Sequence, residues 1–184
     1  MPDTLSSDVI LNATRGDAAA VSMIYRHYHL SIFRYLFYRV NNRQTAEDLT
    51  SEVFIRMLGS LSRYRMQGVP FQAWLFRIAR NLAIDHNRVA KVRNHVPLQE
   101  TLAANNPGPE TTVERKLTSE RLNRAVAKLN QDQRDVIVLR FVVNLAIAET
   151  AMVVDKSQDA VKGLQRRGLA SLRKLLSDVE VDYV

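Results

Sequence analysis

Cysteine is absent from this sequence, and glycine and proline are scarce, with 6 and 5 copies among 184 residues. The lack of cysteine excludes disulfide bonds, thiolate metal sites and cysteine nucleophiles. Few glycines and prolines predict long helices, because these residue types interrupt helices most often. No segment shows sustained alternation of polar and apolar residues. The sequence therefore predicts an all-α fold.

Long hydrophobic runs are also missing. No stretch approaches the roughly 18 apolar residues that a membrane-spanning helix needs. The N-terminal residues MPDTLSSD contain no basic segment followed by an apolar one, as a signal peptide would. We therefore expect no membrane insertion and a cytoplasmic location.

Signatures of catalysis are absent too. The four histidines show no metal-binding spacing such as HExxH, and no glycine-rich phosphate loop occurs. The adjacent carboxylates Glu47 and Asp48 suit the positive end of a helix, which accounts for them without chemistry. We expect no catalytic residues, no metal and no cofactor, so an enzyme is the least favoured class.

What the chain does have is positive charge. Lys and Arg total 26 against 19 Asp and Glu, a formal net charge of +7. This excess favours a polyanionic partner, with nucleic acid ahead of a membrane surface. Hydrophobic residues make up 46% of the chain, enough to form packed cores.

The segment over 71–93 is the most informative one. Its apolar residues recur with helical spacing and form one stripe: Phe71, Trp74, Leu75, Ile78 and Leu82. A basic and amide-bearing stripe lies on another side, composed of Arg77, Asn81 and Arg88 with Arg80 and Asp85 beside it. Such a face can bind phosphates and base edges while a core holds the opposite face. The alternative is an ordinary solvated polar face.

Helical periodicity predicts further helices before this one. They cover a short segment capped by Ser7 or Asp8, then 18–40 after a break at Gly16, and 46–61 with Thr45 as N-cap. Residues 96–113 hold three of the five prolines and lack periodicity, so they read as a flexible linker. We therefore expect two small helical domains, over 8–95 and 114–178.

The C-terminal domain is predicted to contain a helix-turn-helix. A helix over 147–154 is followed by the turn VDKS and by a helix that Ser157 caps. The N-terminal part of such a second helix reads bases in the major groove, which places Asp159, Lys162 and Arg166 nearest the bases. Residues nearer the DNA backbone or at the margin of the face are Lys156, Gln158, Arg167 and Arg173.

These segments resemble a known family. AEDLTSEVFIRML followed by FQAWLFRIARNLAIDHNR resembles region 2 of bacterial sigma factors, and LNQDQRDVIVLRFVVNLAIAETAMVVDKSQDAVKGLQRRGLASLRKLL resembles region 4. The order and the linker are those of the extracytoplasmic-function class, which keeps only these two domains. The resemblance covers most of residues 8–176. It implies a protein that binds core RNA polymerase and directs it to promoters.

The resemblance also implies roles for individual residues. The first domain would recognise and melt the −10 element, with a base turned out of the stack received by the loop over 64–69. Residues implied for this element are Tyr64, Gln67, Arg77, Arg80, Asn81 and Arg88. The helix starting at Gln158 would read the −35 element. Two features depart from the common family pattern: Asp155 in the interhelix turn, and Gly163 and Gly168 where Ser or Ala is usual.

Partners follow from the same resemblance. The helix over 46–61 would bind the clamp helices of the beta-prime subunit through Asp48, Glu52, Phe54 and Arg56, with Glu52 standing where the family more often has glutamine. The second domain would contact the beta flap, and an anti-sigma factor is a further partner. Two other interpretations stay open: a free-standing helix-turn-helix regulator, and a sigma mimic that sequesters an anti-sigma factor. The first would not need the region 2 motifs, and the second would not need two basic faces.

Overall fold

The structure is a computed structural model that describes residues 5–66, 68–93 and 113–177. Helices form all the regular secondary structure of these residues, which confirms the predicted all-α class. The first four make up what we call the N-terminal unit: α1 (Ser7–Thr14), α2 (Ala18–Val40), α3 (Arg43–Leu61) and α4 (Phe71–Arg93). The predicted linker over 96–113 lies almost entirely outside the described residues.

Local hydrogen bonds explain where these helices start. Ser6 caps α1 and Asp17 caps α2, each accepting from backbone N–H groups of the first turn. The expected cap at Thr45 is wrong: Asn42 is the N-cap of α3, and its Oδ1 accepts from the Thr45 backbone N–H at 2.9 Å. The helix therefore begins at Arg43, because the asparagine supplies an acceptor three residues earlier.

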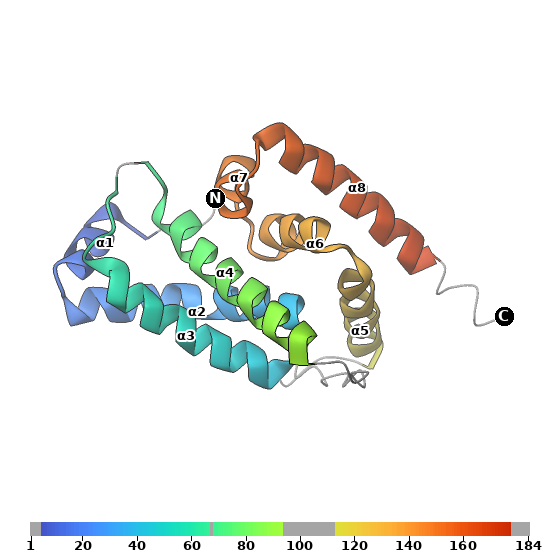
Figure 1. Cartoon of the computed structure of the whole chain (residues 1–184), viewed down its shortest axis with the longest axis horizontal. Coiled ribbons are helices and arrows are strands. Elements are labelled where there is room, and N and C mark those ends of the chain that lie inside the picture. Colours follow the sequence, from blue (N-terminus) through green and yellow to red (C-terminus); the bar gives the residue numbers. More distant parts are fainter. Residues whose placement is uncertain (1–4, 67, 94–112, 178–184) are drawn as a thin grey trace.

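The core of the N-terminal unit is aliphatic and aromatic. Helices α2, α3 and α4 pack on one another, and α1 lies against α2. Tyr35 of α2 contacts Phe76 of α4 edge-to-face with ring centroids 5.8 Å apart, and both side chains are fully buried. Phe76 lies outside the predicted apolar stripe. α4 is buried over a wider arc than a single stripe requires, because it is the central helix of the molecule (Figure 1).

The C-terminal unit is built from α5 (Val113–Lys128), α6 (Gln131–Ile137), the short π-helix η1 (Val138–Val142), α7 (Ile147–Val154) and α8 (Gln158–Ser177). Asn130 caps α6 by accepting from the Gln133 N–H at 2.9 Å. The π-turn was not predicted. It ends at Val142, and Asn144, two residues later, has a left-handed φ of 67° in the connection to α7.

The two units are in contact. α4 packs along α7, and α2 packs against α5, α6 and η1 (Figure 1). α8 packs on α5, α6 and α7 and lies on the far side of the molecule from α3. In the part of the chain that the structure describes, no helix combines the length and apolar character needed to cross a bilayer.

Candidate nucleic-acid interface

The basic face of α4 is divided between the partner unit and solvent. The Arg77 Nη2 donates to the Met152 carbonyl oxygen of α7 at 2.6 Å. The Arg80 Nε donates to the carboxylate of Asp135 in α6 at 3.0 Å. Asn81 and Arg88, farther along the same helix, are exposed. On this face of α4, Arg77 and Arg80 therefore contact the C-terminal unit, whereas Asn81 and Arg88 are exposed.

The loop before α4 is organised by Tyr64. Its hydroxyl donates to the Val69 carbonyl oxygen at 2.9 Å, and its ring packs on Phe71 and Trp74 with centroids 5.3 and 5.0 Å away. The side chain is only 9% exposed, so in this conformation its ring offers no free stacking surface. Burial raises the pKa of Tyr64 above its ordinary value, which keeps the hydroxyl a donor. Gln67 lies outside the described residues.

The second basic face lies on α8 and is open. Gln158, Asp159, Lys162, Arg166, Arg167 and Arg173 are all exposed. Lys162 Nζ is 3.0 Å from Asp159 Oδ1, and Lys156 Nζ is 3.2 Å from Asp132 Oδ2, so both lysines already hold surface carboxylates. Exposed pairs of this kind exchange easily for phosphates, because each contributes little stability in water.

The helix-turn-helix geometry depends on two unusual backbone positions. Asp155 adopts the left-handed region with φ 56°, so it makes the turn that glycine often makes in the family. Gly168 lies where α8 crosses α6: a Cβ there would come within 2.8 Å of Ile137 Cγ1. Arg140 of η1 also fixes α8, donating from Nε to Gln165 Oε1 at 3.1 Å and from Nη1 to the Leu145 carbonyl oxygen.

An acidic and apolar face lies on α3. Asp48 is exposed, and Glu52 Oε1 accepts from Arg56 Nε at 2.8 Å one turn later. Ile55, which the sequence analysis missed, is 62% exposed and lies within about 60° of Asp48 and Glu52 around the helix, on the far side of Asp48 from Glu52. Phe54 is 6% exposed and packs against Tyr25, so it supports this face from beneath. An apolar residue on the polar side of α3 was the signal that could have identified Ile55.

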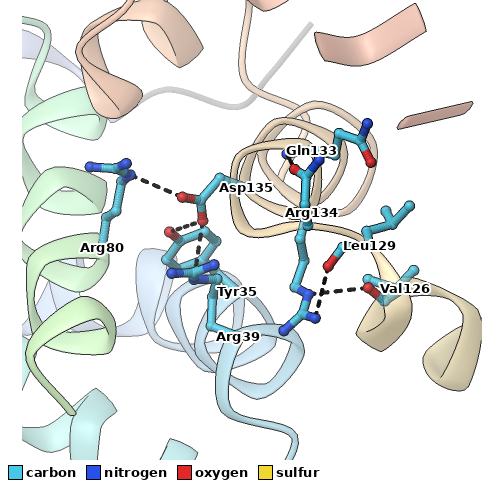
Figure 2. Close-up of polar contacts among 9 residues, drawn as sticks. Tyr35, Arg39, Arg80, Val126, Leu129, Gln133, Arg134 and Asp135 are labelled. Carbon is cyan, nitrogen blue, oxygen red and sulfur yellow. Dashed lines mark hydrogen bonds and ion pairs between the residues drawn. The ribbon is translucent and has the colours of Figure 1, made fainter. Parts of the chain in front are cut away.

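A buried polar cluster joins the two units, and sequence reasoning did not find it (Figure 2). Asp135 of α6 is 1% exposed and contacts Tyr35 and Arg39 of α2 and Arg80 of α4. Burial raises the pKa of Tyr35 well above its ordinary value, and the negative charge of Asp135 raises it further. The phenol therefore stays protonated and donates. Arg134, next in sequence, turns away and binds carbonyl oxygens at the end of α5.

These surfaces offer groups that can bind a partner. Among the described residues, no group of three or more His, Asp or Glu side chains could hold a metal ion. Arginines and lysines on α4 and α8 offer N–H donors to phosphates and base edges, while α3 offers carboxylates around an exposed aliphatic side chain.

Comparison with known proteins matches the chain in two places. The Sigma-70 region 2 family covers residues 24–92, and the Sigma-70 region 4 family covers residues 125–174. The ECF RNA polymerase sigma factor BldN of Streptomyces coelicolor is 40% identical over 173 residues, which span 93% of this chain and 66% of that protein. The ECF RNA polymerase sigma factor ShbA of Streptomyces griseus is 32% identical over 182 residues, 94% of this chain and 95% of that protein.

A solved structure has the same fold. The sigma factor RpoE from Bartonella quintana, in complex with the anti-sigma factor NepR, matches with a TM-score of 0.71 and 19% identity. The match covers 85% of this chain and 96% of that one. The order of helices described above is therefore that of other two-unit proteins of this kind.

Proposed function

Because the chain belongs to the extracytoplasmic-function family of RNA polymerase sigma factors, we propose that it binds core RNA polymerase and directs it to specific promoters. The observation that carries this function is the pair of basic helical faces, α4 and α8, on separate units that match regions 2 and 4. A free-standing regulator needs only the second face. The proposed domains are 8–95 and 114–178, with the linker 96–113 between them.

The N-terminal unit is assigned to the polymerase and to the −10 element. Asp48, Glu52 and Arg56 of α3 contact the clamp helices of the beta-prime subunit, with Phe54 supporting them from below. Arg77, Arg80, Asn81 and Arg88 of α4 bind phosphates or bases of the melted strand. Tyr64 shapes the loop over 64–69 in which Gln67 meets an extruded base; its packed ring favours this positioning role.

The C-terminal unit is assigned to the −35 element and to the beta flap. Asp159, Lys162 and Arg166 meet base edges, with Gln158 at the margin of this surface, while Lys156, Arg167 and Arg173 hold the backbone. An anti-sigma factor is the further partner that the family implies. The polymerase performs all the chemistry, and the chain contributes binding alone. Since promoters are transcribed in the bacterial cytoplasm, the proposed function places the protein there.

Reconstituted transcription tests the function. Purified core polymerase with this chain should start RNA at defined sites of a genomic promoter library, and core alone should not. The double variant K162A/R166A should lose at least about tenfold in −35-dependent initiation, since each base or phosphate contact contributes roughly 1–3 kcal/mol. Its affinity for core should stay unchanged.

A matched control removes two positive charges elsewhere on the same unit. Arg124 and Lys128 are exposed and lie on α5 rather than on α8, so R124A/K128A should transcribe like the wild type. If both double variants lose initiation equally, the contribution of α8 comes from the net positive charge of the unit and not from specific contacts. Duplex binding without core, combined with no initiation, would favour a free-standing regulator.

A further inference from the structure

Within the part of the chain that the structure describes, Asp135 is the one acidic residue of the buried cluster between the units, and its side-chain partners Tyr35, Arg39 and Arg80 come from the other unit. Its Oδ1 accepts from the Tyr35 hydroxyl at 2.8 Å and lies 3.1 Å from Arg39 Nε, and its Oδ2 accepts from Arg80 Nε at 3.0 Å (Figure 2). We call Tyr35, Arg39 and Arg80 the arginine cradle. The carboxylate leaves this cradle whenever the units separate.

The single carboxylate of Asp135 does not satisfy all the hydrogen-bond donors of the arginine cradle. Two guanidinium groups face one negative charge, so the cluster keeps an excess of positive charge in a buried setting. The Arg39 side chain is fully buried, yet within the described residues none of its three nitrogens has a hydrogen-bond partner; its contact with Asp135 is an ion pair by distance alone. Buried guanidinium donors without acceptors indicate a site suited to an anion with more oxygens.

We propose that the arginine cradle is a binding site for a backbone phosphate of DNA, and that Asp135 occupies it as an internal competitor while the two units are closed. A phosphodiester group presents two charged oxygens, each able to accept several hydrogen bonds, and arginine binds carboxylate and phosphate with the same donors. The tyrosine hydroxyl, held protonated, adds a neutral donor. This inference rests on the proposed DNA-binding function of α4.

The closed arrangement covers the same face. Arg77 donates to the Met152 carbonyl oxygen, and α7 lies along α4 beside Arg80. Single-stranded DNA therefore cannot reach these arginines until α6 and α7 move away. The basic face of α8 is exposed in the same state. Closure thus restrains −10 binding while leaving the −35 surface available.

Replacing Asp135 with asparagine should open the molecule rather than unfold it. D135N keeps the size of the side chain and an acceptor for Tyr35, but it leaves two buried arginines without a counter-ion. Buried charges that lose their partner are strongly unfavourable. Separation of the units returns both arginines to water, so the population shifts toward the open state.

The first measurement is the distance between the units in the full chain. The sequence has no cysteine, so S51C on exposed α3 and A170C on exposed α8 accept a donor and acceptor dye at defined positions. Energy transfer should fall in D135N. The matched control is E120Q on α5 of the same unit: Glu120 carries the same charge but is half-exposed and pairs with Arg124, so its energy transfer should not change.

The second measurement is affinity for a labelled oligothymidylate, which has phosphates but no promoter sequence. D135N should bind about tenfold more tightly than wild type, within the usual range of coupling between two states. The slope of log affinity against log salt should steepen by about 0.7 for each phosphate gained. E120Q, which removes an equal charge, should bind like wild type.

The double variant D135N/R39Q distinguishes phosphate binding by the arginine cradle from the separation of the two units alone. It should show the low energy transfer of D135N but not its gain in affinity, because the open cradle lacks Arg39. D135N/R80Q provides a second route if the Arg39 variant melts early by circular dichroism. Unchanged energy transfer in D135N, no gain in its affinity, or a gain that survives both arginine substitutions would overturn the proposal.

The proposed function fails independently. Wild-type chain that cannot direct core polymerase to promoters would refute the sigma role whatever the dyes report. If the wild type initiates normally but D135N shows the same energy transfer and the same DNA affinity as the wild type, only the proposal for the arginine cradle is refuted.

Discussion

Gly168 has no Cβ, and this absence lets α8, the helix proposed to contact the −35 element, pack closely on α6. The closest approach of α8 to α6 occurs at this residue, where a Cβ would come within 2.8 Å of Ile137 Cγ1 and 3.1 Å of its Cδ1. Ile137 is 4% exposed and cannot move freely. Glycine in mid-helix costs about 1 kcal/mol relative to alanine, and here that cost is offset by close packing.

We predict that G168A destabilises the protein by about 1–3 kcal/mol, because overpacking outweighs the gain in helix propensity. Gly163 gives the matched control on the same helix. A Cβ there meets only the Arg167 guanidinium at 3.4 Å, so G163A should be neutral or stabilise by up to about 1 kcal/mol. Urea denaturation of both variants measures the difference. A G168A protein as stable as G163A would contradict the crossing geometry.

At the scale of elements, α3 has a surface that its own fold does not need. Ile55 is 62% exposed on the same side of the helix as the carboxylates of Asp48 and Glu52. Isolated exposed apolar residues are common, but one surrounded by charges on a helix proposed to dock resembles the centre of an interface. The charged residues around it would set orientation, and the aliphatic side chain would supply buried area.

We expect I55A to weaken binding to core polymerase by about tenfold, in line with loss of an interface anchor. Its folding stability should change by less than about 0.5 kcal/mol, because the side chain is already in solvent. Leu30, 51% exposed on α2, provides the control: L30A should bind core normally. Fluorescence anisotropy with labelled chain and core measures both. Equal weakening by the two variants would mean that loss of exposed apolar area in general, rather than this face of α3, weakens the binding.

Element types and bounds were largely readable from the sequence because they depend on local patterns. The break at Gly16, the helix over 18–40 and the cap at Ser157 follow from spacing and short-range hydrogen bonds. The π-turn over 138–142 was not readable, because its backbone is set by burial of Leu139 and Leu145 against other helices. The predicted start of α3 was too late, because Asn42, three residues before Thr45, supplies the cap.

The interface between the units was the part that the sequence could not predict. Tyr35 and Asp135 are 100 residues apart, and nothing near either one indicates the other. An arginine within an apolar stripe, such as Arg39, reads as a snorkelling surface residue until its counter-ion is known. The sequence predicts that the arginines of α4 share one face of the helix. Whether that face is exposed to solvent or contacts the other unit depends on how the two units associate.

For the whole molecule, the protonation of buried tyrosines gives a global test of packing. Burial raises the pKa of Tyr28 to about 12, with a smaller contribution from the negative charge of Glu149 on α7. Tyr35 and Tyr38 are shifted in the same direction by burial. In the unfolded chain a tyrosine titrates near 10. Between these values the unfolded state loses protons that the native state retains.

Stability should therefore be independent of these groups below pH 10 and should fall as the pH rises from about 10 toward 12. The unfolding constant increases by at most about tenfold per pH unit for each such tyrosine. Y28F removes one of them, so its stability should decline less steeply than that of wild type, whatever the substitution costs at neutral pH. Urea denaturation at a series of pH values measures the slopes, and curves that run parallel between pH 7 and 9 provide the internal control. If the two proteins also lose stability in parallel above pH 10, the Tyr28 hydroxyl is reached by water, and Tyr28 of α2 is not packed against Phe71 of α4 as the structure describes.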